Sequence, residues 1–340
     1  MEIRDALDTL LAGRDLDRAE ARALIETLMS GDATPAQIGG VLVALRAKGE
    51  TVDEITGAAE AMRELATRVD VDAPHLVDTC GTGGSGSNKL FNVSTAAAFV
   101  TAAAGAHVAK HGNRGMSSAS GSADVLEAAG VNLDLTPEQV ARCIAEVGVG
   151  FLFAQRHHGA MKHVGPARRE LGVRTLFNVL GPLTNPAGAP NQVLGVFDRR
   201  WQRPLAEVLQ ALGSRHVLVV HADGLDEISL VAPTHIVELR KDAITEYDIE
   251  PAQFGIESSS HDGLRADTPA ASLALVQAAL AGKGPAADIV ALNAGAAIYA
   301  SGVALSLADG VTMAQDAIAA RLARERLDEL VRISSLMGED

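Results

Sequence analysis

Aromatic residues, cysteines and positive charges are all scarce in this sequence of 340 residues. It contains seven Phe, two Tyr, one Trp and two Cys, and its 29 Lys and Arg stand against 43 Asp and Glu, giving a formal net charge of −14. Nucleic-acid-binding domains usually present a basic face with aromatic side chains, so the composition argues against a nucleic-acid partner. Cys80 and Cys143 are far apart in the sequence and fit no metal-binding or redox motif.

Long apolar runs and an N-terminal targeting segment are also missing. No run of about 18 apolar residues is present that would span a membrane, and the first residues lack the charged-then-apolar pattern of a signal peptide. We therefore expect a cytoplasmic protein without a membrane partner. Because 47% of the residues are apolar, the chain has enough to bury a sizeable core, and its length suits two domains.

Residues 1–72 have the pattern of a small helical domain. Asp17 with Glu20, and Thr51 with Glu54, have the spacing of capping boxes, in which two side chains satisfy the free N–H groups of a helix start. No alternation typical of a strand interrupts this region. The sequence therefore predicts a short helical bundle at the N-terminus.

After Pro74, short apolar runs alternate with helical segments, a pattern typical of βαβ units around a parallel sheet. We expect this α/β domain to cover residues 73–159 and 187–340. Residues 160–186 are helical in pattern without a strand, and we expect them to rejoin the helical domain. The β-branched alternation of residues 230–251 predicts an antiparallel hairpin at the edge of the sheet.

A glycine-rich loop follows the first predicted strand. The motif GTGGSG contains Gly81, Gly83, Gly84 and Gly86, and glycine lets an anion approach the main chain and permits positive φ. A loop of this kind before a helix is a typical phosphate site, although a tight strand-to-helix turn needs the same glycines. A dinucleotide fingerprint fits poorly, because about seven residues separate the loop from the helix and no acidic residue follows the next strand.

We expect two further polar segments to lie at the same edge of the sheet as the glycine-rich loop. NVST starts the next helix with hydroxyls that cap it or contact phosphate. KHGNRGMSS, which begins at Lys110, follows the second predicted strand and gathers three potential cations on an otherwise acidic chain. A solvated turn explains a lone Lys-His pair, but the carboxyl ends of parallel strands meet at one edge, so we expect the segments to converge.

Carboxylates and arginines complete the candidate site. Asp226 and Glu227 follow a predicted strand; adjacent carboxylates often only face solvent, but in a phosphate-binding protein they suit Mg²⁺. The guanidinium of Arg168 or Arg169 can bind a carboxylate through two hydrogen bonds. A charged, solvent-exposed helix face is the alternative explanation for the two arginines. Gly181 and the proline after it make a rigid bend that either walls a flat pocket or ends a helix.

Together, the motifs GTGG, NVST, KHGNR, GSAD, FLFAQRHHGAMKHV, RTLFNVLGPLTNP and GLDE, in this order, resemble those of the anthranilate phosphoribosyltransferases. The resemblance covers nearly the whole chain and implies an α/β fold of the nucleoside phosphorylase and phosphoribosyltransferase type. It implies a small all-helical N-terminal domain, a larger domain with a central, mainly parallel sheet, and a homodimer formed through the helical domain.

The resemblance also implies the reaction. The phosphoribosyl group of phosphoribosyl pyrophosphate (PRPP) passes to the amino group of anthranilate, which gives N-(5-phosphoribosyl)anthranilate and pyrophosphate in tryptophan biosynthesis. Mg²⁺ is required, with two ions per subunit bound together with PRPP. No side chain is expected to act as an acid or a base, since the aromatic amine is itself the nucleophile.

Roles for individual residues follow from the resemblance. Lys110 and Arg168 are implied to position the transition state, and Arg168 rather than Arg169 matches the arginine that binds anthranilate, 13 residues before the glycine of GPL. The residues implied to bind PRPP are Gly81, Gly84, Ser85, Asn92, Val93, Ser94, Thr95, Lys110, His111, Gly112, Asn113, Arg114, Ser117, Ser118 and Ser122. Those implied to bind anthranilate are Gly81, His111, Asn113, His158, Arg168 and Gly181, and the implied metal ligands are Ser94, Asp226 and Glu227.

Two features depart from the family pattern. Ser85 stands where members usually have aspartate, and the interval from Gly81 to Asn92 is one residue longer, with Lys89 as the added residue. Two other functions stay open at this point: a pyrimidine nucleoside phosphorylase, whose lysine-rich serine-glycine loop is missing here, and a non-catalytic relative that binds nucleic acid, which the net charge of −14 disfavours.

Overall fold

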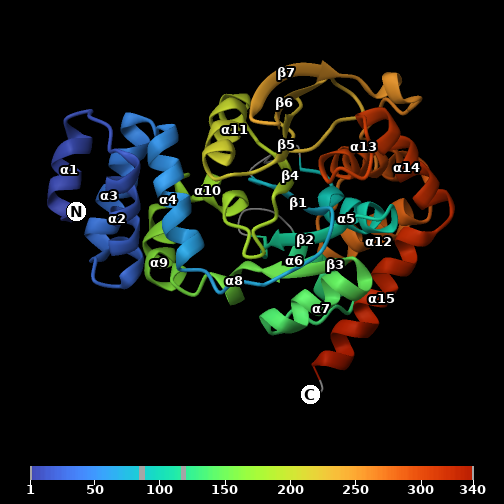
Figure 1. The fold of residues 1–340 in the computed structure, drawn as a ribbon, viewed down its shortest axis with the longest axis horizontal. Helices are drawn as coiled ribbons and strands as arrows, with labels where there is room; N and C mark the ends of the chain where they lie inside the picture. Colours follow the sequence, from blue (N-terminus) through green and yellow to red (C-terminus); the bar gives the residue numbers. More distant parts are fainter. Residues whose placement is uncertain (1, 84–88, 116–119, 339–340) are drawn as a thin grey trace.

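The computed structural model describes residues 2–83, 89–115 and 120–338. A helical bundle lies at one end of the molecule and an α/β part at the other (Figure 1). The bundle contains α1 (Ile3–Leu11), α2 (Arg18–Ser30), α3 (Pro35–Lys48) and α4 (Val52–Glu64). The capping boxes predicted at Asp17 and Thr51 are both formed. Farther along the chain, α9 (Met161–Leu171) packs against α2 and α3.

The α/β part is built on a seven-stranded sheet in the order β3-β2-β1-β4-β5-β6-β7. Its strands are β1 (Leu76–Gly81), β2 (His107–Gly112), β3 (Val149–Phe153), β4 (Asn191–Gly195), β5 (His216–His221), β6 (Thr234–Arg240) and β7 (Ala243–Ile249). The strands β1 to β5 pair in parallel, whereas β6 and β7 are antiparallel at the edge. The predicted mainly parallel sheet and its edge hairpin are thus confirmed.

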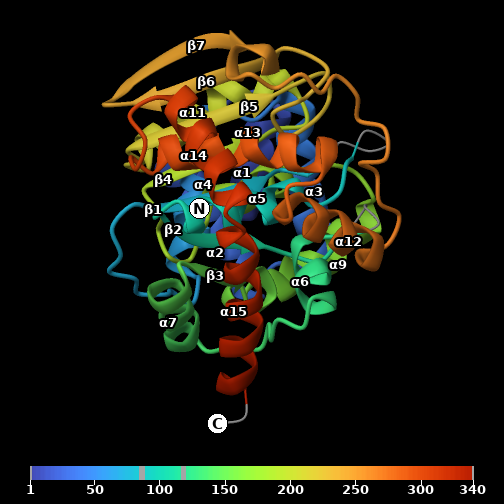
Figure 2. The ribbon, with the colours of Figure 1, turned by 90° about the vertical axis from the view of Figure 1, so that its right-hand side faces the viewer.

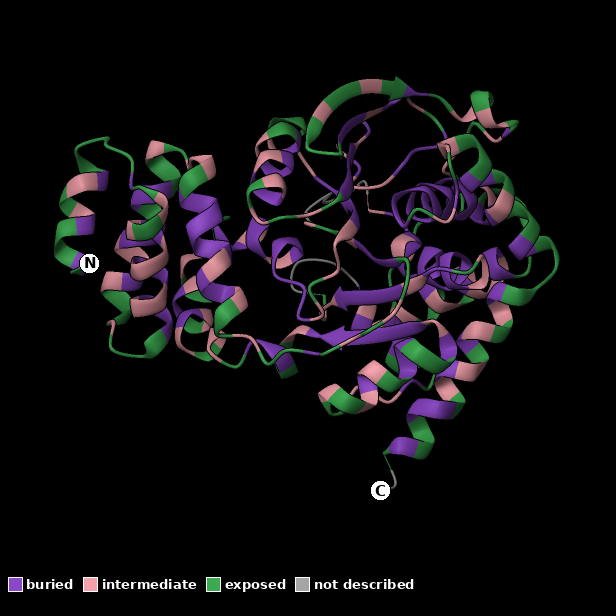
Figure 3. Ribbon diagram, viewed as in Figure 1, coloured by how far each residue is buried: buried purple, intermediate pink, exposed green. Residues whose placement is uncertain are grey.

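Helices cover both faces of the sheet (Figure 2). One face is covered by α5 (Val93–Ala103), α12 (Pro269–Leu280), α13 (Gly284–Ala300), α14 (Leu307–Ala319) and α15 (Leu322–Met337). The other face packs against α11 (Gln202–Ala211), which also contacts α4. The central strands are buried on both sides (Figure 3), as parallel sheets usually are. On β5, for example, Leu218 belongs to one apolar core and Val219 to the other.

Shorter helices and 3₁₀ turns complete the fold. They are α6 (Ser122–Ala128), α7 (Pro137–Val147), α8 (Ala154–His157) and α10 (Phe177–Leu180), with 3₁₀ turns η2 (Gly181–Leu183), η3 (Arg199–Trp201) and η4 (Pro251–Phe254). Within the described residues, no single helix is both long and apolar enough to cross a membrane; α12 and α13 meet the length and composition only as a pair that is bent by 77°.

Candidate active site

The carboxyl ends of neighbouring parallel strands bring the predicted segments together. β1 ends at Gly81 and β2 at Gly112, while the loop after β5 contains Asp226 and Glu227. α5 begins at this edge of the sheet, and the ammonium group of Lys110 on β2 lies 3.3 Å from the hydroxyl of Ser94 in its first turn. The structure therefore gathers the NVST segment, the acidic pair and the described parts of the glycine loop and of the basic segment at one edge.

Backbone N–H groups hold the two carboxylates. Gly83 donates its N–H to Oδ2 of Asp226 at 3.0 Å, and Ser94 donates its N–H to Oε1 of Glu227 at 3.2 Å. A Cβ atom at Gly81 would lie 2.6 Å from Oδ2 of Asp226, and one at Gly195 would lie 1.7 Å from the Asp226 carbonyl oxygen. Within the chain, the group that lies against Gly81 and Gly195 is therefore the loop of Asp226. A bound anion is not needed to explain these two glycines.

The acidic pair brings two carboxyl groups into one partly buried site. Burial and the adjacent Asp226 carboxylate raise the pKa of Glu227 to about 8. Like charges that share a site in this way are relieved by a bound metal ion. Asp226, Glu227 and the hydroxyl of Ser94 supply only hard oxygen donors, which suit Mg²⁺, although no group of three or more His, Cys, Asp or Glu in the described ranges forms a metal cluster.

Lys110 is a buried cation at the centre of the site. The residue is only 3% exposed, and its ammonium group donates a hydrogen bond to the carbonyl oxygen of Thr79. Burial lowers the pKa of Lys110, whereas the charges of Asp78, Cys80 and Glu227 oppose that shift. Lys110 forms no salt bridge with another described residue, and a buried ammonium without an ion pair is costly, so Lys110 is suited to an anionic ligand.

Asp78 is a buried residue of the candidate site that the sequence analysis did not find. It is buried on β1, where Oδ1 accepts the N–H of His111 at 3.2 Å and Oδ2 accepts the amide of Asn185 at 2.8 Å. Burial raises the pKa of Asp78, while Asn185 and Lys110 oppose the shift. Its carboxylate therefore fixes the end of β2 on which Lys110 and His111 stand. The sequence feature that could have identified Asp78 is an aspartate inside an otherwise largely apolar strand.

Two histidines predicted to bind anthranilate lie together. The ring centroids of His111 and His158 are 5.1 Å apart, and Nδ1 of His111 lies 3.1 Å from the carbonyl oxygen of Gly181, to which it must donate. Burial lowers the pKa of both rings, to about 4 in His158. Both Nε2 atoms are buried without a hydrogen-bond partner among the described residues, so each neutral ring offers a free acceptor.

Arg168 and Arg169 differ sharply in environment. Arg168 on α9 is partly buried, its guanidinium carbon lies 5.1 Å from the ring centroid of Phe177, and burial lowers its pKa. No salt bridge involves Arg168 in the part of the chain that is described. Arg169 is exposed. A stacked, partly desolvated guanidinium without a carboxylate partner fits a planar carboxylate ligand.

The other residues predicted to bind PRPP differ in their burial and in their hydrogen bonds. Val93 and Thr95 are buried in the first turn of α5, and Oγ1 of Thr95 has no partner among the described residues. The side-chain oxygen of Asn92 accepts hydrogen bonds from the hydroxyls of Ser120 and Ser272, so it shapes the loop before α5.

The basic segment is held by side-chain and backbone contacts. Asn113 accepts the N–H of Arg114 at 2.8 Å, and the guanidinium of Arg114 is paired with Asp124 and Glu127. A Cβ atom on Gly112 would lie 2.1 Å from the hydroxyl of Ser122, which explains the glycine there. The predicted residues Gly84, Ser85, Ser117 and Ser118 lie outside the described residues.

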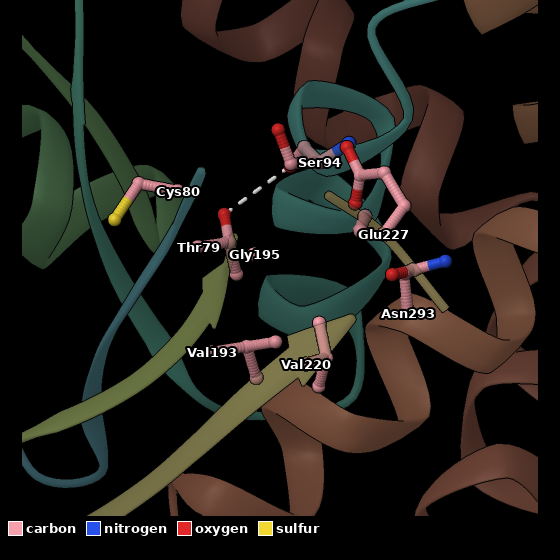
Figure 4. A pocket seen from close by; sticks show the side chains of 9 residues that line it. Thr79, Cys80, Ser94, Val193, Gly195, Val220, Glu227 and Asn293 are labelled. Carbon is pink, nitrogen blue, oxygen red and sulfur yellow. Dashed lines mark hydrogen bonds between the residues drawn. The ribbon is translucent and has the colours of Figure 1, made fainter. Parts of the chain in front are cut away.

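A small cavity lies beside the acidic pair (Figure 4). Its volume is about 10 Å³, and its lining includes Thr79, Ser94, Glu227 and Asn293. Figure 4 shows Ser94 and Glu227 together above Thr79, whose hydroxyl donates to the Ser94 carbonyl oxygen at 3.2 Å. About one water molecule needs this much space, so a larger ligand does not fit in it.

Family models match nearly the whole chain. Residues 4–66 match the glycosyl transferase family, helical bundle domain, and residues 73–323 match the glycosyl transferase family, a/b domain. The anthranilate phosphoribosyltransferase of Thioalkalivibrio sulfidiphilus is 61% identical over 337 residues, which cover 98% of this chain and 99% of that protein. The enzyme of the same name from Methylococcus capsulatus is 60% identical over 336 residues and 98% of each chain.

Solved structures agree with these relatives. The anthranilate phosphoribosyltransferase of Thermus thermophilus superposes with a TM-score of 0.92 at 46% identity, over 97% of this chain and 99% of that chain. The enzyme of Saccharomyces cerevisiae, solved in complex with PRPP and Mg, gives a TM-score of 0.88 at 26% identity over 98% of both chains. The helical bundle, the sheet order and these similarities together show that the chain belongs to the anthranilate phosphoribosyltransferase family.

Proposed function

We propose that the edge of the sheet formed by β1, β2 and β5 is where this chain transfers the phosphoribosyl group of PRPP to the amino group of anthranilate. The observation that carries the proposal is one constellation: the buried cation Lys110 reaches the start of α5 beside a carboxylate pair. The relatives at about 60% identity support this reaction and not the nucleoside phosphorylase or nucleic-acid-binding alternatives.

We propose that Asp226 and Glu227, with Ser94, hold Mg²⁺, and that two ions bind per subunit with PRPP. The raised pKa of Glu227 supports this assignment, as does the yeast relative solved with PRPP and Mg. When bound, Mg²⁺ neutralises negative charge on the departing pyrophosphate.

The chain's own residues supply binding and positioning. The N-terminus of α5 and the ammonium of Lys110 attract the phosphate groups. Arg168, stacked on Phe177, binds the carboxylate of anthranilate and so fixes the direction from which its amine approaches. The acceptors at Nε2 of His111 and His158 suit an N–H of the amine. Holding both reactants in this way is a large part of the rate acceleration.

We propose the domain division given by the sequence: residues 1–72 with 160–186, and residues 73–159 with 187–340. It is supported by the packing of α9 against α2 and α3. We further propose a homodimer formed through the helical domain, which is supported by two exposed apolar side chains on its helices, Leu11 and Val43. The cytoplasm remains the predicted site of action.

One assay tests the proposed reaction. Purified protein with Mg²⁺ and PRPP should consume anthranilate, followed by loss of its fluorescence, and release one pyrophosphate for each anthranilate lost. Thymidine with phosphate should give no product, and a DNA fragment should not be retained. Turnover of thymidine without turnover of anthranilate would reverse the assignment.

A further inference from the structure

The pairing of β1 with β2 ends before either strand does. The last pair in its register is Val77 with Val108. By contrast, β1 pairs with β4 as far as Gly81, and β2 pairs with β3 as far as Gly112. Beyond Val77 and Val108, contacts other than the regular backbone ladder must therefore hold the two strand ends together.

Two buried side chains take the place of the ladder. Oδ1 of Asp78 accepts the N–H of His111 at 3.2 Å. The amide nitrogen of Asn185 donates to the carbonyl oxygen of Ala109 at 2.8 Å and to Oδ2 of Asp78 at 2.8 Å. All four residues are buried, and buried backbone groups require hydrogen-bond partners. Asp78 and Asn185 therefore form a clamp between β1 and the end of β2.

The clamp requires a carboxylate at position 78. Oδ1 of Asn185 accepts the N–H of Ala187 at 2.9 Å, and its amide nitrogen donates to the carbonyl oxygen of Ala109, so the amide cannot be turned round. Two donors, one from His111 and one from Asn185, therefore face the two oxygens of Asp78. An asparagine side chain has only one acceptor atom, so it would place its own N–H group against one of these donors.

The clamp lies between residues that serve different substrates in the proposed reaction. On β2, the ammonium of Lys110 lies 3.3 Å from the hydroxyl of Ser94, where phosphate is proposed to bind. The next residue, His111, is proposed to meet anthranilate, and its Nδ1 donates to the carbonyl oxygen of Gly181 at 3.1 Å. Asn185 follows Gly181 in the same segment. A shift of the end of β2 would therefore move groups of both proposed substrate sites at once.

We propose that Asp78 and Asn185 are positioning residues, which align the amine of anthranilate with the ribose carbon of PRPP by fixing the end of β2. This role rests on the function proposed above. Misplacement of a reactant by about 1 Å can cost roughly a hundredfold in rate. Loss of the clamp should therefore lower kcat far more than it weakens the binding of either substrate.

Asp78→Asn is the direct test, because it keeps the shape of the side chain and removes one acceptor. We expect kcat per binding site to fall about tenfold to a hundredfold, while KM for PRPP and KM for anthranilate each stay within about threefold. Asn185→Ala removes the other half of the clamp and should act in the same direction. The double variant should lose little more than the more impaired single variant, because both substitutions break one clamp.

Glu238→Gln is the matched control for loss of a buried carboxylate. Glu238 accepts hydrogen bonds from the hydroxyls of Tyr247 and Tyr299. It pairs in register with Leu218, in the middle of β5, and has no role in the proposed reaction. Glu238→Gln should lower stability toward urea and leave kcat per binding site unchanged.

Steady-state kinetics on the full chain give kcat and both KM values. Titration calorimetry with PRPP and Mg²⁺ counts the binding sites, so unfolded protein does not enter kcat per site. An unchanged kcat per site in Asp78→Asn and Asn185→Ala overturns the proposal, and so does an equal loss of kcat in Glu238→Gln. A large rise in either KM at constant kcat also overturns it, because the clamp then serves binding and not alignment.

If Asp78→Asn does not fold, Asn185→Ala decides by the same measurements. Wild-type protein that fails to consume anthranilate contradicts the proposed function instead, so the two failures are distinguishable.

Discussion

The backbone N–H of Gly83 donates a hydrogen bond to Oδ2 of Asp226 at 3.0 Å, across 143 residues of sequence. This bond ties the loop after β1 to the loop after β5. Gly83 has a φ of +65°, which favours glycine, and Gly81 is close enough to the same carboxylate that a Cβ would meet it at 2.6 Å. Gly81 and Gly83 therefore help to position the carboxylate of Asp226, a proposed metal ligand.

Asp226→Asn should lower activity sharply and change its dependence on Mg²⁺. The substitution keeps the shape of the side chain but removes a charge from the proposed metal site, so we expect a loss of about tenfold to a hundredfold at limiting Mg²⁺. Excess Mg²⁺ should restore part of the rate. Initial rates measured across a Mg²⁺ titration check this, with the exposed Asp262→Asn as control. An unchanged Mg²⁺ profile would remove the carboxylates from the metal site.

Arg168→Ala should raise KM for anthranilate far more than KM for PRPP. The loss of a charged contact to a carboxylate costs about 1.5–3 kcal/mol, or roughly tenfold to a hundredfold in affinity. Arg169→Ala is the matched control, because Arg169 is exposed one position along the same helix and should have little effect. If Arg169→Ala impairs anthranilate use and Arg168→Ala does not, the assignment of the two arginines is reversed.

Gly195→Ala should displace the acidic loop. A Cβ there would lie 1.7 Å from the backbone carbonyl oxygen of Asp226, and backbone atoms cannot yield as a flexible side chain can. We expect a loss of about 1–3 kcal/mol or more in the free energy of unfolding, together with weaker Mg²⁺ activation. Urea denaturation measures the first quantity. Gly159→Ala, where a Cβ meets nothing within 4 Å, should be nearly neutral; equal stability of both variants would contradict the tight packing of the loop.

Stability should decrease as the pH falls from about 6.5 to about 4. Burial lowers the pKa of His158 to about 4, against about 6.5 for an exposed histidine. Between these values the unfolded chain binds a proton that the folded chain does not, so the contribution is complete above pH 6.5 and is lost as the pH falls toward 4. For His158 alone the loss is of order 3 kcal/mol.

Urea unfolding at several pH values checks this effect. His158→Asn should flatten the pH dependence relative to wild type. An identical slope in His158→Asn would show that this ring does not stay neutral in the folded protein.

Sedimentation should show a dimer at micromolar concentration. Leu11 is 75% exposed and Val43 is 45% exposed on the helical bundle, and covering such side chains is a common reason for association. A charge at both positions, in the double variant Leu11→Glu with Val43→Glu, should shift the protein toward monomer without a change in helical circular dichroism. A monomeric wild-type protein would contradict the proposed dimer.

The sequence alone determined the fold class of this protein and the starts of two of its N-terminal helices. Capping pairs such as Thr51 with Glu54 are local signals, since both partners lie within one helical turn. The strands alternate with helices at short range, so the mainly parallel sheet with its edge hairpin followed from hydrophobic pattern and connection length. The family was likewise identified from the order of its motifs.

Only the tertiary structure decided how the pieces of the site touch. Asp78 and Asn185 are 107 residues apart, yet their side chains meet at 2.8 Å beneath the end of β2. Nothing local distinguishes the stacked, partly buried Arg168 from the exposed Arg169, because burial depends on what α10 brings against the helix. The presence of glycine at position 195 is likewise explained only by the loop of Asp226, whose backbone leaves no room for a Cβ atom. Local propensity fixes an element, whereas desolvation, pairing and close backbone approach arise only when distant segments pack.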